Sequence, residues 1–473
     1  MKASTGGQQR PGGNPAFAMV LTVRADTQDE AVSSLDFLEP GWGVAAVRHD
    51  GTGDLPGRRQ LLVQVGDEAA LHRLRRAASL DGRVVACTDR LRAMSAGGPI
   101  EVRPRPAFRA AEDLALLYTR GAARLAATIA ADPGTASELT GRSNRVAVIS
   151  DGSAVPGLGD LGPTAALPSL EAKAALCARL AGIDAVPICL DMGLARDADG
   201  TVAAVRAIAP TFGAIILTGI ASPVCSDIER RLRLALDIPV FHDEQHGLPV
   251  VVLAGLRNAL RVADKHMSTA RVVILGTGVT AGAVTRLLLH AGVSDVTVCT
   301  PHGILGPQLR DLPAQTAWLA QQTNPRRLHG PQAQALAGAD AVVDLSPAAR
   351  LDQQLLATMA QPPVVFALSG PEPPAGATAI TATDRPGHPN HITDLLAFPG
   401  ILRGLLDAGA PRVTTDILLA ATDVLAGLVS EDALGPHRLL PDVLDPQVPP
   451  TMAAAVAAVE ASRCRARPRR TAG

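Results

Sequence analysis

Two histidines and two acids lie together in residues 238–247, which read IPVFHDEQHG. His242 and His246 are four residues apart, and Asp243 follows the first of them. This differs by one methylene from H-E-x-x-H, in which two histidines on one helix face bind zinc. The segment IPVF predicts a strand that runs into His242, and Gly247 follows His246 directly. We therefore expect the helix to begin around His246 or later, which disfavours a zinc-hydrolase site.

A glycine turn in VVILGTGVTAGAV has the residue types of a dinucleotide-binding site. Gly276, Gly278 and Ala281 form G-x-G-x-x-A between a predicted strand and a predicted helix. Gly276 allows the tight turn, Gly278 lets the backbone approach a pyrophosphate, and small Ala281 permits close helix–strand packing. The helix N-terminus offers free N–H groups to phosphate. NAD or NADP is therefore the expected cofactor.

The strand after this turn, DVTVCT, ends at Thr300. An acid at this point commonly binds the ribose of NAD, and none is present here. No Arg follows that would favour the 2′-phosphate of NADP. His302 is a candidate for that phosphate, although a solvated loop residue is the simpler interpretation. The pattern leaves the choice between NAD and NADP open.

The overall composition limits the classes of function. The chain has 473 residues, which predicts two to three domains, and its net charge of -1 argues against general nucleic-acid binding. Hydrophobic residues make up 47% and aromatic residues only 2%, so Ala, Leu and Val must fill the cores. No apolar run reaches membrane length, and no signal peptide is apparent. The basic end RCRARPRR is interpreted as a solvated tail rather than a functional arm.

Cysteine usage favours a reducing compartment. The six cysteines are Cys87, Cys177, Cys189, Cys225, Cys299 and Cys464. None forms C-x-x-C, and their spacing does not suggest a disulfide framework, so a cytoplasmic location fits best. Cys225 is a candidate nucleophile, but a small buried hydrophobic residue is the simpler interpretation.

The elements that must position these residues indicate an α/β protein. Residues 1–15 are expected to be a disordered leader, and residues 16–95 read strand, helix, strand, strand, helix, strand, which predicts a ferredoxin-like βαββαβ module. Such a module either binds a small ligand, pairs with a copy of itself or serves as a packing appendage. Apolar strands then alternate with Ala-rich helices from 145 to 243, and a second alternating unit begins at 248. This alternation predicts parallel sheets covered by helices.

Several stretches together resemble the bacterial malic enzymes. They are LYTRGAARLAATIAADP, VAVISDGSAVPGLGDLGPTAALPSLEAKAALCARLAGIDAVPICLD, DIPVFHDEQHG and LLAFPGILRGLLD. The leading module resembles the ACT-type ligand-binding domain that precedes some of them. The resemblance implies a catalytic domain at 105–247, an NAD(P)-binding Rossmann domain at 248–432, and a C-terminal helix with a basic tail at 433–473.

The resemblance also implies an activity and its parts. Members of the family oxidise malate with NAD or NADP and decarboxylate it, with Mg or Mn bound at the substrate, and they are oligomers. Tyr118 matches the tyrosine that returns a proton to carbon, although Arg120 replaces the usual proline two residues later. Lys173 matches the lysine that removes the hydroxyl proton. A buried lysine with a lowered pKa can serve as a base. Asp243 matches an acid of the metal-and-substrate segment.

The metal site departs from the family. The Glu-Asp pair of the family corresponds to Thr218 and Gly219, and its asparagine to Ile215 or Ile216. The third ligand corresponds to Glu244, which is one methylene longer than aspartate. Hard divalent ions need several oxygen ligands and prefer carboxylates. We therefore expect Mg or Mn binding to be lost or poor, with Glu244 and Asp243 as the remaining weak ligands.

The substrate end departs as well. A family asparagine corresponds to Gly370, and an Asn-Asn pair corresponds to Thr393 and Asp394. An added carboxylate at Asp394 would repel a dicarboxylate substrate. Two hypotheses follow. The chain is either a divergent oxidoreductase for malate or a related 2-hydroxy acid, or an inactive relative that binds nucleotide or acid as a regulatory partner.

Overall fold

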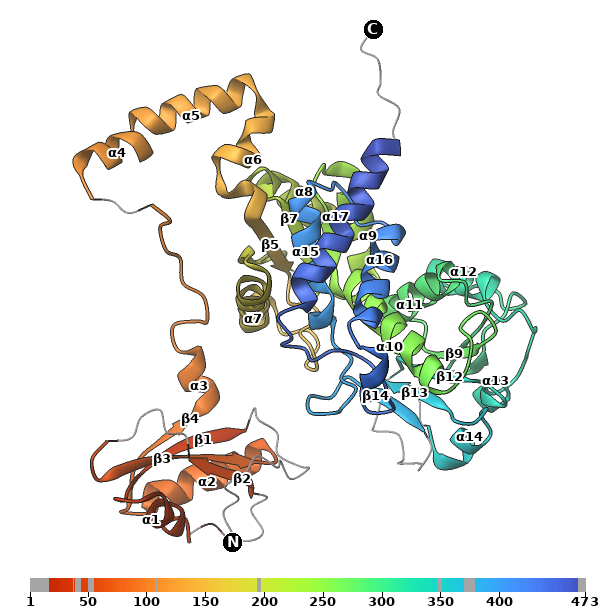
Figure 1. The fold of residues 1–473 in the computed structure, drawn as a ribbon, viewed down its shortest axis with the longest axis horizontal. Helices are drawn as coiled ribbons and strands as arrows, with labels where there is room; N and C mark the ends of the chain where they lie inside the picture. The colour runs from red at the N-terminus through yellow and green to blue at the C-terminus, as the bar shows by residue number, and fades with distance from the viewer. Residues whose placement is uncertain are drawn as a thin grey trace. The chain divides into compact units, whose positions relative to one another are not determined.

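This computed structural model describes residues 17–36, 38, 44–49, 55–106, 109–193, 197–346, 351–369 and 379–466. The chain divides into two compact units, residues 1–103 and 104–473 (Figure 1). The boundary falls between the predicted small module and the predicted catalytic domain. The finer boundaries predicted at 247 and 432 lie inside the second unit and stay predictions, and the predicted leader and the end of the basic tail lie outside the described residues.

The first unit is built on a four-stranded antiparallel sheet in the order β2-β3-β1-β4. Its elements follow the predicted order: β1 (Ala18–Arg24), α1 (Gln28–Ser33), β2 (Val44–His49), β3 (Arg58–Val65), α2 (Glu68–Leu80), β4 (Val84–Asp89) and then α3 (Arg90–Ser95). One face of β1 is buried through Met19, Leu21 and Val23, at every second residue. This alternation is that of a sheet with one covered face.

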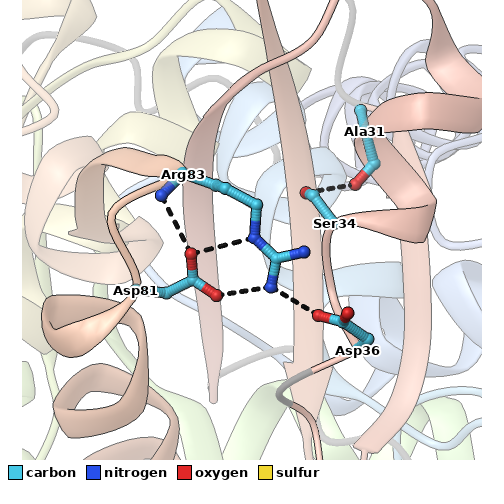
Figure 2. Close-up of polar contacts among 5 residues, drawn as sticks. All are labelled: Ala31, Ser34, Asp36, Asp81 and Arg83. Carbon is cyan, nitrogen blue, oxygen red and sulfur yellow. Dashed lines mark hydrogen bonds and ion pairs between the residues drawn. The ribbon is translucent and has the colours of Figure 1, made fainter.

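A charged cluster around Arg83 links the start of β4 to the residues that follow α1 (Figure 2). The guanidinium of Arg83 donates to both carboxylate oxygens of Asp81, at 3.0 and 2.6 Å, and also to Asp36. The hydrogen bonds from Arg83 lower the pKa of Asp81 to about 2. Ser34 donates to the carbonyl oxygen of Ala31 at 2.6 Å and so closes the end of α1. The side chains of Arg83 and Asp36 are exposed, although that of Asp81 is only 13% exposed, so the cluster orients the segment more than it stabilises it.

The second unit contains a four-stranded parallel sheet in the order β6-β5-β7-β8. Its elements are β5 (Arg145–Ser150), α7 (Pro163–Ala181), β6 (Asp184–Cys189), α8 (Ala198–Ile208), β7 (Ala214–Leu217), α9 (Val224–Ala235) and β8 (Val240–His242). β5 and β7 are buried along almost their whole length, as expected for parallel strands covered on both faces. The helix α7 begins with Pro163 in its first turn, where the missing N–H of proline costs no hydrogen bond.

A six-stranded sheet follows, in the order β11-β10-β9-β12-β13-β14. Its elements are α10 (Leu248–Val262), β9 (Arg271–Leu275), α11 (Val279–His290), β10 (Asp295–Thr300), β11 (Gly303–Ile304), α12 (Ala314–Gln322), α13 (Gln332–Leu336), β12 (Ala341–Asp344), α14 (Gln353–Ala357), β13 (Val364–Ala367) and β14 (Ile380–Thr383). The strands pair in parallel except for β11, which folds back on β10. The predicted α/β class is confirmed, while the short strands β11 and β14 were not predicted.

Helices complete the second unit. They are α4 (Ala111–Leu117), α5 (Arg120–Ala131), α6 (Ala136–Leu139), α15 (Phe398–Asp407), α16 (Thr415–Gly427) and α17 (Val448–Ala466). Two short elements matter for the site: η5 (Asp243–Gly247), a π-helical turn, and η6 (Asp394–Leu396). The remaining 3-10 turns are η2 (Pro133–Thr135), η3 (Gly141–Asn144), η4 (Ala209–Thr211) and η7 (Glu431–Ala433). Within the described part of the chain, no helix is long and apolar enough to span a membrane.

Candidate functional site

Lys173 is the central charged group of the candidate active site. Its side chain is only 14% exposed, and its Nζ atom lies 3.0 Å from Oδ2 of Asp243 and 3.0 Å from Oδ2 of Asp394. The ammonium also lies over the ring of Phe398, 4.2 Å from the ring centroid. Lys173 therefore makes two charge-assisted contacts and one cation–π contact in a single pocket.

Four segments that are distant in sequence position these groups. Lys173 lies on α7 beside the buried stripe of Leu170, Ala174 and Cys177, which holds that face of the helix against the unit. Asp243 begins η5 directly after β8, while Asp394 begins η6, and α15 begins with Phe398. α15 contacts α7, and η6 contacts η5, which closes the ring of contacts. The Lys173 cluster thus lies where a parallel strand ends, the usual position of a ligand site in α/β proteins.

The two carboxylates determine the charge of Lys173. Burial alone lowers the pKa of the ammonium, but the neighbouring charges and hydrogen bonds of Asp243 and Asp394 outweigh it, and the net result is a raised pKa. The sequence suggested a buried lysine with a lowered pKa, and the structure has the opposite direction. Lys173 is therefore an ammonium ion at neutral pH, and it must lose a proton before it can act as a base, which becomes easier when a carboxylate partner is removed.

The two acids of η5 face different neighbours. Asp243 is paired with Lys173 through Oδ2, while its Oδ1 atom is buried without a hydrogen-bond partner among the described residues. Desolvation and the neighbouring Asp243 carboxylate raise the pKa of Glu244, against a smaller lowering effect of the side chain of Thr280, which follows the glycine turn. The acids of η5 therefore connect the Lys173 pocket to the start of α11.

The residues present do not fit a divalent metal ion. Thr218 has no carboxylate, and Gly219 has φ +60° and a carbonyl oxygen that accepts from Ser150 Oγ at 3.1 Å and from Ala154 N at 3.0 Å. A Cβ atom at Gly219 would lie 2.9 Å from Ser150 Oγ. The described residues contain no group of three or more His, Cys, Asp or Glu side chains that could hold a metal ion. The carboxylate of Asp243 is paired with the ammonium of Lys173 instead of with a metal ion.

The two histidines have a structural arrangement. The Nδ1 atom of His246 accepts a hydrogen bond from the backbone N of His242 at 3.0 Å, and both residues are buried. Burial lowers the pKa of His242 to about 4 and that of His246 to about 3, so both rings are neutral at pH 7. Helical structure begins at Asp243 as a π turn, earlier than the predicted start around His246. His246 Nδ1 accepts the hydrogen bond that closes this turn, so the two histidines do not have the arrangement of a zinc-binding H-E-x-x-H helix.

The glycine turn has the geometry that a dinucleotide requires. Gly276 has φ +117°, and a Cβ atom there would lie 3.0 Å from the carbonyl oxygen of Leu345. A Cβ atom at Gly278 would meet no atom within 4 Å, so the backbone is open to a ligand at that point. Ala281 is 1% exposed and lies in the first turn of α11. These residues fit a pyrophosphate at the N-terminus of α11.

A cavity of about 260 Å³ adjoins the glycine turn. Gly276, Thr300, His302, Gln332 and Ser346 are among its lining residues. The hydroxyl of Thr300 donates to the carbonyl oxygen of Gly303 at 3.2 Å and accepts from the backbone N of His302 at 3.1 Å. No acidic side chain lines this cavity among the described residues. The position where an acid would contact the ribose is therefore neutral.

We expect Thr300→Asp to raise the preference for NADH over NADPH at least tenfold. A carboxylate at this point accepts hydrogen bonds from ribose hydroxyls and repels a 2′-phosphate, and about 1.4 kcal/mol is enough for a tenfold change. The measurement is fluorescence titration of the protein with each reduced nucleotide. Thr300→Asn, which has the same shape without the charge, is the control. Equal preference ratios in the Asp variant and the wild type would show that the ribose does not reach this strand end.

Tyr118, a predicted catalytic residue, is not part of the Lys173 cluster. Tyr118 follows α4, is 80% exposed, and its hydroxyl makes no hydrogen bond within the described part of the chain. Neither α4 nor α5 has a buried residue. The structure therefore does not bring Tyr118 to Lys173. Gly370 lies outside the described residues.

Two features of the cluster were missed by sequence reasoning. Asp394 was interpreted only as a group that repels a substrate, and its pairing with Lys173 was not anticipated. Phe398 was given no role, although its ring covers the ammonium. The available signal was the new carboxylate itself, because an unpaired acid in an apolar segment such as TDLLAFPG requires a cation nearby.

Comparison with known proteins gives a consistent result. The family description "Malic enzyme, N-terminal domain" matches residues 107–233. The chain is 38% identical over 465 residues to an NAD-dependent malic enzyme of Geobacillus stearothermophilus, covering 93% of each chain. It is 39% identical over 372 residues to a bifunctional malic/malolactic enzyme of Bacillus subtilis, covering 76% of this chain and 89% of that one.

Solved structures agree with these relatives. A malic enzyme from Pyrococcus horikoshii matches with a TM-score of 0.73 and 38% identity, covering 78% of this chain and 88% of that chain. A malic enzyme of Entamoeba histolytica matches with a TM-score of 0.75 and 31% identity, covering 80% of this chain and 81% of that chain. The Geobacillus alignment covers a larger share of this chain than the second unit alone, so it extends into the first unit.

Proposed function

Since this chain belongs to the malic enzyme family, we propose that it oxidises and decarboxylates malate or a related 2-hydroxy acid with NAD or NADP, and with little dependence on a divalent metal ion. The observation that carries the proposal is the ammonium of Lys173 between Asp243 and Asp394. At neutral pH it supplies a positive charge beside Asp243, in the stretch that corresponds to the family's metal-and-substrate segment.

The residues support a division of roles in this reaction. Lys173 is the group that takes the hydroxyl proton of the substrate after it has released its own proton, and the opening of one ion pair favours that release because it lowers the pKa of the ammonium. A nicotinamide nucleotide held by its pyrophosphate at the glycine turn would accept a hydride from the carbon that carries the substrate hydroxyl. Contacts between η5 and α11 join that turn to the Lys173 cluster. Tyr118 remains the proposed proton donor to carbon, and it must approach a Lys173 pocket to do so.

Oligomer formation is part of the proposal. Exposed apolar side chains on and beside α4 and α5 include Leu114, Leu116, Leu117 and Leu125. Apolar surface of this kind favours association with a partner. We expect a homodimer or larger assembly in which this surface is covered. Assembly is also the route by which Tyr118 would leave solvent and meet a substrate pocket.

The first unit and the location complete the proposal. The βαββαβ order and the antiparallel sheet support a ferredoxin-like, ACT-like module that binds a small ligand. All six cysteines are free thiols, which supports a reducing cytoplasm as the place of action.

The metal requirement is tested by turnover with and without manganese. We expect slow reduction of NAD or NADP with malate, changed less than twofold by added manganese or by a chelator. Loss of Lewis-acid stabilisation, at roughly 5 kcal/mol, corresponds to a rate three to four decades below that of a metal-dependent enzyme. The readout is nicotinamide absorbance. Strong stimulation by manganese to an ordinary enzymatic rate would refute the proposal.

A second candidate function is an inactive relative that binds nucleotide or acid as a partner protein. The exposed position of Tyr118 and the double pairing of Lys173 favour it. Thermal unfolding with NAD, NADP and small acids separates the two candidates, because a ligand that binds the native state raises the melting temperature. Stabilisation by nucleotide without turnover on any 2-hydroxy acid would favour the partner role.

A further inference from the structure

A second cavity lies in the second unit, outside the Lys173 pocket and the glycine turn. Its volume is about 690 Å³. It is lined by residues of α9, η5 and α11, and by the segment that leads into α16. Its charged side chains are four arginines and one carboxylate: Arg230, Arg233, Arg286, Arg412 and Glu229. None of these five residues belongs to the Lys173 cluster or to the cavity at the glycine turn.

Arg286 is the clearest sign of a missing partner. It is half-buried on α11, and burial lowers the pKa of its guanidinium. Its guanidinium lies 5.1 Å from the ring centroid of Trp318 but makes no hydrogen bond or ion pair with any described residue. An arginine carries five N–H donors, and those of Arg286 have no protein acceptor among the described residues, so they are available to an anion that enters the cavity.

The carboxylates nearby do not neutralise the cavity. Glu229 is 5% exposed, and its Oε1 atom has no hydrogen-bond partner and is 3.8 Å from Nε of Arg233. Arg230 is paired with Asp227 at 2.5 Å. Arg412 donates to the backbone carbonyl oxygen of Arg233 and has no acidic partner among the described residues. Arg286 and Arg412 therefore keep their charge without a counter-charge in contact.

Neutral donors add to this positive lining. Gln245 of η5 lines the cavity, and its Nε2 atom is buried without a hydrogen-bond partner in the described part of the chain. Thr414 and Thr415 line it at the N-terminus of α16, a helix of 13 residues. The side chain of Thr414 already accepts from the backbone N of Ile417, and Asp416 lies in the first turn, so this helix end adds hydroxyl groups rather than a free anion site. Guanidinium, amide and hydroxyl donors thus line one cavity.

We propose that this cavity binds a small polyanion, a molecule with two or more carboxylate or phosphate groups. Planar guanidinium groups match both kinds of anion through bidentate hydrogen bonds. The ligand contacts Gln245 in η5, two residues after Asp243. Its binding therefore stabilises the turn that holds Asp243 against Lys173.

Isothermal titration with citrate and, separately, with pyrophosphate tests the proposal at constant ionic strength. We expect saturable binding of at least one of them. Citrate alone indicates a polycarboxylate ligand, and pyrophosphate alone indicates a phosphate ligand. Amide hydrogen exchange with the bound probe should show protection at 243–247 and 412–416. Heat no greater than that of matched sodium chloride, for both probes, would overturn the proposal.

Three variants locate the binding. Arg286→Met keeps the bulk of the side chain without its charge and should weaken binding at least tenfold. Arg233→Gln, a more exposed position, should also weaken binding and serves if the first variant is unstable. Arg231→Gln is the matched control, because Arg231 is on the same helix but pairs with Asp199 and Asp227 and does not line the cavity. Equal binding by all variants would place the probe elsewhere and reject the site.

Discussion

Replacing Lys173 by methionine is expected to lower the free energy of unfolding by about 3 kcal/mol at neutral pH, since removing one partner of a buried ion pair strands the other charge. The side chains of Asp243 and Asp394 are 14% and 27% exposed and share this single cation. Without it, two carboxylates repel each other in a pocket with little water. Denaturant titration of the wild type and the variant gives the value.

The effect has a defined pH dependence. In the wild type, the raised pKa of Lys173 means that its contribution is complete below the ordinary value of 10.5 and is lost as pH rises through the folded-state pKa. In the methionine variant, the loss of stability should shrink as pH falls and the two carboxylates take up protons. A defect that stayed constant across this range would indicate a packing effect instead of a charge effect.

Two further variants separate charge from chemistry. Lys173→Arg retains the charge and should retain most of the stability while it abolishes turnover, because arginine does not release a proton at usable pH. The double variant Lys173→Met with Asp394→Asn should recover part of the lost stability, because only one buried carboxylate then remains. A loss below about 1 kcal/mol in the methionine variant would contradict the charged cluster, since it falls in the range of ordinary surface ion pairs.

Replacing Asp394 by asparagine is expected to raise kcat/KM for malate about tenfold, which corresponds to about 1.4 kcal/mol. Asparagine has nearly the same shape but cannot form the ion pair at 3.0 Å with Lys173. The change removes a negative charge from the pocket of a dicarboxylate substrate and frees one side of the ammonium for it. It also lowers the pKa of Lys173, which increases the fraction of neutral base.

The control for this variant is Asp394→Glu, which keeps the charge and should show no gain. Initial rates of nicotinamide reduction with malate give the comparison. A rate for Asp394→Asn at or below that of the wild type would show that Asp394 assists the reaction, and it would favour a substrate that carries fewer negative charges than malate.

The sequence by itself determined the fold class and the order of the main strands and helices, apart from the short strands β11 and β14. Apolar runs such as RVAVIS and RVVIL predict buried parallel strands, because only such strands are apolar on both faces. The glycine turn was equally readable, since Gly276 and Gly278 meet a backbone requirement that is local to the turn. Local rules of this kind depend on neighbours within a few residues, which the sequence contains directly.

Only the tertiary structure decided the state of the candidate site. Lys173 and Asp394 are 221 residues apart, and no local pattern relates them. The resemblance to the family predicted a base at Lys173, but the charge of that group depends on which side chains surround it. The same holds for Tyr118, which matches a family motif and yet is exposed. Electrostatic interactions act through space and depend on burial, so they could be evaluated only after the chain had been folded.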